Sequence, residues 1–123
     1  MAHILIVEDN EIMQKLVTAI LEREGHTVTV AGNGKEGLDL LSAPEPPYDL
    51  IIADIMMPYA NGFEILNKAN KSEGRRIPVI IVSNLSNEQM VLEGFQLGAA
   101  DYVTKPIMAG ELLLRVKRLL NNH

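Results

Sequence analysis

Three short apolar stretches, each followed by polar residues, constrain the fold of this chain most strongly. They are ILIV at residues 4–7, LIIA at 50–53 and VIIV at 79–82, and a weaker fourth stretch is DYVT at 101–104. Continuous runs of Val, Ile and Leu bounded by turn residues are typical of strands buried on both faces, as in a parallel sheet. Such strands alternating with helical segments predict an α/β fold with right-handed crossovers.

Periodicity and turn residues predict five strand–helix units. The expected strands are His3–Glu8, His26–Ala31, Asp49–Asp54, Val79–Ser83 and Asp101–Thr104. The expected helices are Glu11–Glu24, Gly34–Leu41, Asn61–Asn70, Asn87–Gly98 and Ala109–Asn121, with Asn10, Asn61 and Asn87 as N-caps and Gly25 as a stop. The alternating HTVTVA segment suits an edge strand. In the first helix, we expect an inward stripe of Met13, Leu16, Val17, Ile20 and Leu21.

Length and composition set limits on the class of protein. The 123 residues suit one domain spanning 1–123, and 47% hydrophobic residues is an ordinary share for a globular chain. We expect no membrane span, since no apolar run approaches about 20 residues. The absence of Cys fits the cytoplasm and excludes disulfides, thiolate metal sites and a Cys nucleophile. A net charge of −5 argues against direct nucleic-acid binding.

Polar residues follow the apolar runs where ligands usually bind. Glu8 and Asp9 follow the first run, and Asp54 and Ser83 end two others, while Lys105 follows the fourth stretch. Ligands in open parallel sheets bind at the carboxyl ends of the strands. Carboxylates and waters suit Mg²⁺, and an Asp can act as a nucleophile toward a phosphoryl group. The sequence therefore predicts a phosphate-sized acidic site at this edge.

Four motifs in this order resemble the receiver domain of two-component response regulators. They are VEDN, the D-x-M-M-P of Asp54–Pro58, VSN, and GAADYVTKP, and the resemblance covers Ala2 to Leu120. The resemblance implies a flavodoxin-like, doubly wound, five-stranded parallel sheet in the order 2-1-3-4-5 with helices on both faces.

The resemblance also implies a role for each site residue. Asp54 would accept the phosphoryl group, and Mg²⁺ (or Mn²⁺) would be bound by Glu8, Asp9, Asp54 and the main-chain carbonyl of Met56, with Glu8 acting mainly through water. Ser83 and Lys105 would contact the phosphate oxygens, and Tyr102 would be the switch aromatic. The peptide bond before Pro106 is expected to be cis.

Partners follow from the same resemblance. The donor would be a histidine kinase or a phosphotransfer protein, and the chain would be a monomer or a phosphorylation-dependent homodimer. A downstream protein would bind the face made by the fourth helix, the fifth strand and the fifth helix. The fourth helix carries more apolar residues than one buried stripe can use: Leu92, Phe95 and Ala99 form one line, while Met90 and Val91 fall to its side. On the fifth helix, Leu114 points away from the stripe of Leu112, Leu113, Val116, Leu119 and Leu120. Exposed apolar residues on neighbouring elements motivate this surface. Lys117 and Arg118 would be its charged rim.

Two other functions compete with a phosphorylated switch. One is a receiver-like adaptor that binds partners without phosphorylation, which the complete acidic set and Lys105 disfavour. The other is an aspartate-nucleophile phosphatase; such enzymes resemble D-x-D-x-[TV], whereas Met56 lies two residues after Asp54. We therefore expect no separate enzymatic activity, only a phosphoacceptor that assists its own phosphotransfer and dephosphorylation.

Other features of the chain favour ordinary structural roles. GNGKEG at 32–37 lacks the spacing of a phosphate-binding loop, and His3, His26 and His123 have no ligand-like neighbours in the sequence. Asn84, Met56 and Leu85 depart from the usual family residues. Because Met56 and Leu85 would offer no hydrogen bond to an attacking water, we expect a long-lived phosphoryl state.

Overall fold

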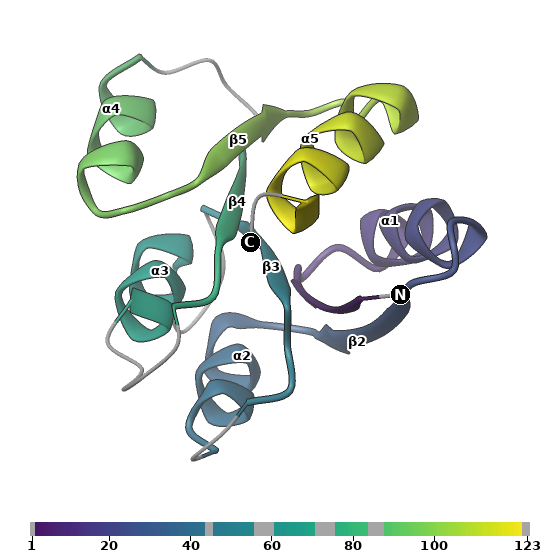
Figure 1. Cartoon of the computed structure of the whole chain (residues 1–123). Helices are drawn as coiled ribbons and strands as arrows, with labels where there is room; N and C mark the ends of the chain where they lie inside the picture. Colours follow the sequence, from purple (N-terminus) through teal and green to yellow (C-terminus); the bar gives the residue numbers. More distant parts are fainter. Residues whose placement is uncertain (1, 44–45, 56–60, 71–75, 84–87, 122–123) are drawn as a thin grey trace.

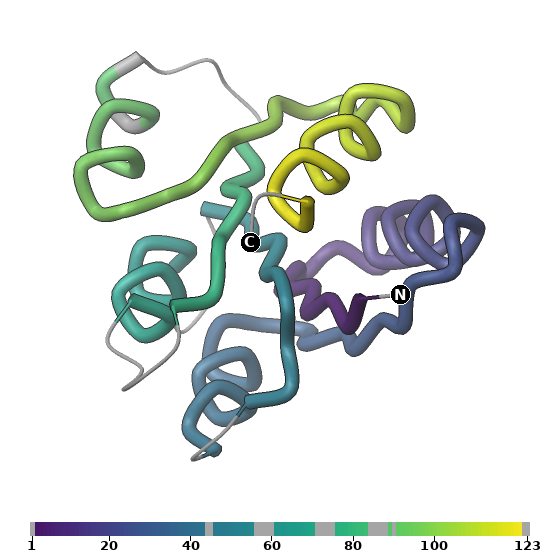
Figure 2. The backbone as a smooth tube through the Cα atoms, viewed as in Figure 1, coloured from purple at the N-terminus to yellow at the C-terminus, as the bar shows by residue number. Residues whose placement is uncertain are grey.

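The computed structural model describes residues 2–43, 46–55, 61–70, 76–83 and 88–121, and its elements alternate along the chain (Figure 1, Figure 2). The strands are β1 (His3–Val7), β2 (Thr27–Ala31), β3 (Leu50–Asp54), β4 (Val79–Ser83) and β5 (Asp101–Thr104). The helices are α1 (Glu11–Arg23), α2 (Gly34–Leu41), α3 (Gly62–Asn70), α4 (Glu88–Gln96) and α5 (Ala109–Asn121). These bounds differ from the predicted ones by two residues or fewer, which is the usual uncertainty at element ends.

All five strands form one parallel sheet in the order β2-β1-β3-β4-β5. Helices α1 and α5 cover one face, and α2, α3 and α4 cover the other (Figure 1). The predicted fold class and strand order are therefore confirmed. HTVTVA is an edge strand, also as expected.

The sheet divides the core into two apolar clusters, because successive strand side chains point to opposite faces. In β1, Leu5 and Val7 join the cluster under α2 and α3, while Ile4 and Ile6 join the cluster under α1 and α5. Burial on both faces explains why β1, β3 and β4 are continuous apolar runs.

Asparagine side chains cap three helices. The Oδ1 atoms of Asn10, Asn33 and Asn61 accept hydrogen bonds from the main-chain N–H groups of Met13 (3.0 Å), Glu36 (2.9 Å) and Glu64 (3.1 Å). The expected stop after α1 is also present, since Gly25 adopts a φ of 88°. The expected cap Asn87 lies outside the described residues.

The rotation of two helices differs from the prediction. Val17 and Leu21 of α1 are buried, but Leu16 is 41% exposed and leaves the expected stripe. On α4, Val91 and Gly94 turn toward the sheet, whereas Leu92 is 57% exposed. The stripe predicted for α5 is confirmed, with Leu112 and Val116 buried and Leu114 69% exposed. Among the helices of the described residues, none has the length and apolar character needed to cross a membrane.

Candidate active site

The carboxyl ends of four parallel strands carry the predicted site residues to one edge of the sheet. Glu8 and Asp9 follow β1 directly, and Asp54 and Ser83 are the last residues of β3 and β4. Lys105 follows β5 directly. The registers align these ends, because Asp54 lies opposite Val82 and Ser83 opposite Thr104. The sequence-predicted convergence at this edge is therefore present.

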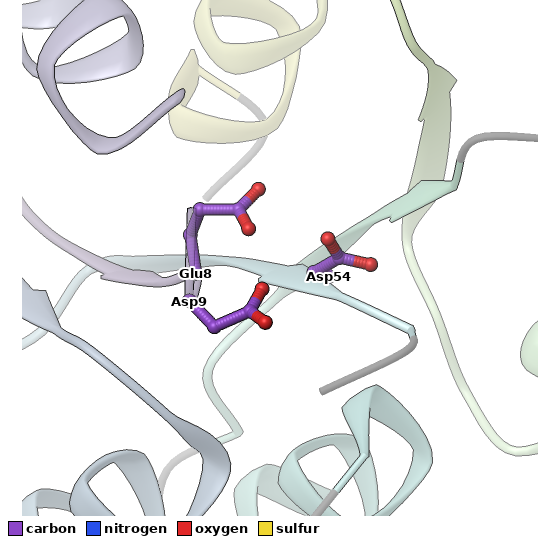
Figure 3. Close-up of side chains that lie close together, drawn as sticks. All are labelled: Glu8, Asp9 and Asp54. Carbon is purple, nitrogen blue, oxygen red and sulfur yellow. The ribbon is translucent and has the colours of Figure 1, made fainter. Parts of the chain in front are cut away.

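Three carboxylates form an acidic cluster at this edge. One oxygen of each of Glu8, Asp9 and Asp54 lies within 4.8 Å of the other two, and the three side chains point toward a common space (Figure 3). Glu8 and Asp54 are buried, with exposures of 4% and 6%, whereas Asp9 is exposed. The cluster is thus open to solvent on the Asp9 side and closed beneath.

Lys105 partly neutralises this cluster. Its Nζ atom donates a hydrogen bond to Oδ2 of Asp54 at 2.7 Å and lies 3.1 Å from Oε1 of Glu8. One ammonium therefore bridges the two buried carboxylates. Because three negative charges face one positive charge, the site retains an affinity for a further cation.

The same contacts shift two pKa values. Burial raises the pKa of Glu8, and the nearby Asp54 charge adds to this, against the lowering effects of the Asn10 N–H and Lys105. Burial acts to lower the pKa of Lys105, but its hydrogen bonds to Asp54 and Glu8 and their charges outweigh it, so the Lys105 pKa is raised. Lys105 thus stays cationic beside the acids.

The acidic cluster fits a hexacoordinate divalent cation. Two oxygens bound to one Mg²⁺ at about 2.1 Å lie about 3 Å apart when adjacent and about 4 Å apart when opposite. The separations within 4.8 Å between Glu8, Asp9 and Asp54 come close to this range. Carboxylate oxygens with room for waters are also the ligands that Mg²⁺ prefers. The carbonyl of Met56 lies outside the described residues, as do Asn84 and Leu85.

The loop after β5 is fixed against the end of β4. The Lys105 N–H donates to the Ser83 carbonyl at 2.7 Å, and the Lys105–Pro106 peptide bond is cis, as expected. Ser83 is buried, with an exposure of 7%. This main-chain contact holds the base of the Lys105 side chain beside the end of β4.

Gly62 was not predicted to matter, yet its lack of a side chain is needed beside Asp54. A Cβ atom at Gly62 would lie 2.6 Å from the Asp54 carbonyl oxygen and 3.0 Å from Cα of Ile55. The Gly62 N–H also donates to the Ile55 carbonyl at 3.0 Å. The start of α3 therefore packs directly on the main chain that carries Asp54. The only sequence signal was the glycine after the predicted cap Asn61.

Asn10 and Gln14 were also missed as supports of the site. The Asn10 N–H donates to Oε2 of Glu8 at 3.1 Å, and Nε2 of Gln14 donates to the Glu8 carbonyl at 2.7 Å. The first turn of α1 therefore fixes both the side chain and the main chain of Glu8. Since both contacts are local, the cap at Asn10 was the available signal.

Tyr102 lies on β5, which is separated from β3 by β4. Its ring is half-buried and meets Phe95 of α4 edge to face, with ring centroids 6.1 Å apart. A small cavity lined by Ile55, Ile81, Val91, Phe95 and Tyr102 lies between these rings and the sheet. The predicted switch aromatic thus lies between the exposed surface of α4 and the interior beside β3.

Comparison with known proteins agrees with this geometry. The sequence matches the response regulator receiver domain family over residues 4–117. It is 40% identical over 98% of the chain to an uncharacterized transcriptional regulatory protein, YkoG, of Bacillus subtilis, of which it covers 52%. The chain spans about half the length of the curated relatives it matches.

Solved structures show the same fold at useful sequence identity. The receiver domain of Francisella response regulator 1452 is 34% identical, with a TM-score of 0.87 and 98% of each chain covered. The receiver domain of sensor histidine kinase PA1611 from Pseudomonas aeruginosa, solved with a magnesium ion in its active site cleft, is 30% identical with a TM-score of 0.86, each chain being covered to 98%. This chain therefore belongs to the family of response regulator receiver domains, which act in the phosphorylation-based signalling of two-component systems.

Proposed function

We propose that Asp54 is the phosphoacceptor and that the phosphoryl donor is a phosphohistidine on a histidine kinase or phosphotransfer protein. The observation that carries this proposal is the setting of Asp54: a buried carboxylate at a strand end, 2.7 Å from a lysine ammonium and beside two further acids. A carboxylate so placed can be approached from the open side of the cluster, where Asp9 is exposed.

The transfer needs positioning and charge neutralisation rather than a separate base. An oxygen lone pair of Asp54 forms the new P–O bond while the P–N bond to the donor imidazole breaks, and its electrons return to the imidazole nitrogen. As negative charge builds up on the phosphoryl group, Lys105 can donate a hydrogen bond to a phosphate oxygen, since its Nζ lies within hydrogen-bonding distance of Asp54. The Ser83 hydroxyl would bond another phosphate oxygen. Bound Mg²⁺, held by Glu8, Asp9 and Asp54, would neutralise negative charge on the phosphoryl group.

Acetyl phosphate with Mg²⁺ tests the acceptor directly. Incubation should add one phosphoryl group per chain, seen by mass spectrometry as a base-labile modification, and Asp54→Asn should abolish it. Asp9→Asn is the matched control, because it removes a carboxylate from the same cluster but should slow phosphorylation rather than eliminate the acceptor. Undiminished labelling of the Asp54→Asn protein would place the acceptor elsewhere.

We also propose a docking surface for the phosphodonor around the open side of the site. Ile12 of α1 is 78% exposed and Leu16 is 41% exposed, while Met108, three residues after Lys105, is 63% exposed. Exposed apolar side chains near an acidic centre suit a protein donor rather than a small phosphate ester. This supports the proposed partner class.

The output surface is proposed to be the face of α4, β5 and α5. Leu92, Phe95, Leu97 and Leu114 have exposures between 42% and 69%. Lys117 and Arg118 of the predicted charged rim are both exposed. The Arg118 guanidinium also donates a hydrogen bond to the buried Asp101 carboxylate at 2.8 Å, as Arg115 does. Rotation of Tyr102 toward the cavity beside Ile81 would change this surface upon phosphorylation. Perturbed NMR signals of Phe95 and Leu114 on addition of beryllofluoride and Mg²⁺ are expected; changes confined to residues beside Asp54 would remove this role.

Several narrower expectations belong to the same proposal. Mn²⁺ should replace Mg²⁺, the cytoplasm is the expected compartment, residues 1–123 form one domain, and the domain assists its own dephosphorylation. The long phosphoryl lifetime expected from Met56 and Leu85 depends on residues outside the described ranges. A phosphorylation-independent adaptor finds no observation in its favour.

A further inference from the structure

The edge strand β2 is unprotected in a way that edge strands of soluble proteins usually avoid. It contains Thr, Val and Ala only, with no Pro, Lys or acidic residue between Thr27 and Ala31. In the described part of the chain, β2 is the last strand of the sheet and pairs with β1 alone. A regular, uncharged edge is a template for pairing with another strand.

The main-chain groups on this edge can be assigned. The Thr27 N–H donates to the Ala2 carbonyl, and the Glu8 N–H donates to the Ala31 carbonyl. Peptide groups alternate in direction along a strand, so Thr27, Thr29 and Ala31 face β1. Val28 and Val30 therefore direct their N–H and C=O groups away from the sheet.

This pattern is self-complementary. A two-fold axis perpendicular to the sheet, midway between Thr29 and Thr29 of a second, antiparallel copy, would place Val28 opposite Val30 of that copy. Residues facing outward at positions i and i+2 then form hydrogen-bonded pairs, which gives four main-chain hydrogen bonds around a central Thr29 pair. The result would be one continuous sheet across two chains, in which the outward main-chain groups of Val28 and Val30 in both copies are hydrogen-bonded.

The face of α1 beside this edge is self-complementary as well. Lys15, Thr18, Ala19 and Glu22 line a groove of about 260 Å³ with Val30. Lys15 and Glu22 lie seven residues apart, on either side of the short side chains of Thr18 and Ala19. Neither charge forms an ion pair within the described residues. The same two-fold axis would make the two α1 helices antiparallel, so that Lys15 of each copy would face Glu22 of the other.

The spacing of the elements permits this contact. Helix α1 contacts both β1 and β2 and lies on one face of the sheet beside the β2 edge (Figure 1). With strands about 4.8 Å apart, a helix above the β1–β2 pair lies about 5 Å from an axis outside β2. The two α1 axes would then lie about 10 Å apart, a normal distance for packed helices.

We propose that this chain forms a homodimer through antiparallel β2 pairing and α1 packing, independently of phosphorylation. A second copy is the occupant that fits, because the main-chain pattern and the Lys15–Glu22 charge pattern are each complementary to themselves under one axis. The surface is separate from the acidic cluster, so the dimer does not rest on the proposed phosphoacceptor. The Asp54→Asn variant should dimerise as the unsubstituted protein does.

Analytical ultracentrifugation without Mg²⁺ or phosphodonor tests the proposal. The protein should dimerise as its concentration rises toward about 1 mM. Lys15→Glu or Glu22→Lys alone should weaken the dimer by at least about tenfold, since two pairs become repulsive in each dimer. The double exchange Lys15→Glu with Glu22→Lys should restore the original affinity. A monomer at all concentrations, or a dimer unaffected by either single reversal, would overturn the proposal.

Substitution of Val30 provides a second test on the main chain. Val30→Pro removes an outward N–H without removing a bond to β1 and should leave a monomer, whereas the nearly isosteric Val30→Thr should still dimerise. Hydrogen exchange of the Val28 and Val30 amides should slow with rising protein concentration, while exchange at Thr29 stays slow throughout. If Val30→Pro fails to fold, the charge exchange and the amide exchange decide the outcome. Concentration-independent exchange at Val28 and Val30 would contradict the pairing.

Discussion

The ammonium of Lys105 lies 2.7 Å from the carboxylate of Asp54 and at the same time 3.1 Å from that of Glu8. One cation thus stabilises two buried acids that arrive from different strands. Without this cation, two neighbouring negative charges would be buried without Lys105 between them. Bound Mg²⁺ and Lys105 would therefore act on the same excess of negative charge.

Replacement of Lys105 should destabilise the metal-free protein. Lys105→Met leaves Glu8 and Asp54 buried without their cation, and we expect a loss of about 3 kcal/mol in the free energy of unfolding. Mg²⁺ should recover part of the loss, so the metal-induced rise in Tm should exceed that of the unsubstituted protein. Lys117→Met removes an exposed lysine of α5 and serves as the control. Equal unfolding free energies for both variants would show that the bridge is not a stabilising contact.

Asp9 should behave differently from the buried acids. It is exposed and forms no ion pair within the described residues, so its charge mainly repels Glu8 and Asp54. Asp9→Ala should raise the metal-free free energy of unfolding by about 0.5 kcal/mol and remove most of the Mg²⁺-dependent stabilisation. Thermal denaturation with and without Mg²⁺ measures both effects. The same Mg²⁺ response in both proteins would exclude Asp9 as a ligand.

Gly62 should resist even the smallest substitution. A methyl group at Gly62 would collide with the Asp54 carbonyl at 2.6 Å, a main-chain atom that cannot move freely. Gly62→Ala should cost about 2 kcal/mol of stability and weaken Mg²⁺ binding, because the Asp54 main chain must shift. At Gly110 of α5, nothing lies within 4 Å of an added Cβ. Gly110→Ala, the matched control, should therefore stabilise the protein by up to about 1 kcal/mol in urea denaturation.

The setting of His26, far from the acidic site, predicts that the free energy of unfolding depends on pH. Its Nδ1 accepts a hydrogen bond from the Ala2 N–H at 3.2 Å, and burial lowers the His26 pKa from 6.5. The unfolded chain then binds a proton at a higher pH than the folded chain does. The contribution of His26 to the free energy of unfolding is therefore fully present above pH 6.5. This contribution is lost as the pH falls from 6.5 through the pKa of His26 in the folded chain. Urea denaturation between pH 7.5 and 5 should show a smaller loss for His26→Gln; parallel curves would assign the loss to other groups.

Substitution of the exposed Ile12 and Met108 should slow phosphotransfer from a protein donor but not from a small phosphodonor. Ile12→Ser and Met108→Ser should slow transfer from a phosphohistidine protein by about tenfold, because apolar contact area is lost. Acetyl phosphate has no such contacts, so its rate should stay unchanged. Comparing both donors by phosphate-affinity gel electrophoresis separates docking from chemistry. A parallel loss with both donors would place these residues in the chemical step instead.

Local sequence signals specified the strands and the place of the site. The runs at 4–7, 50–53 and 79–82 are buried on both faces, as is typical of parallel strands covered by helices on both sides. Because parallel strands end at the same edge, the strands together with the strand order implied by the resemblance predicted that Glu8, Asp54 and Ser83 lie at neighbouring strand ends. The caps at Asn10 and Asn61 were readable because a cap bonds an N–H only three residues away.

Tertiary packing decided what local patterns leave open. Leu92 and Val91 are both apolar, and only the rotation of α4 against the sheet turned Val91 inward and Leu92 outward. Lys105 could have extended into solvent, but the ends of β1 and β3 brought two acids within its reach. The need for glycine at position 62 arises from the approach of α3 to the Asp54 carbonyl. Each of these features depends on the distance and rotation between separate elements. A short stretch of neighbouring residues does not determine either.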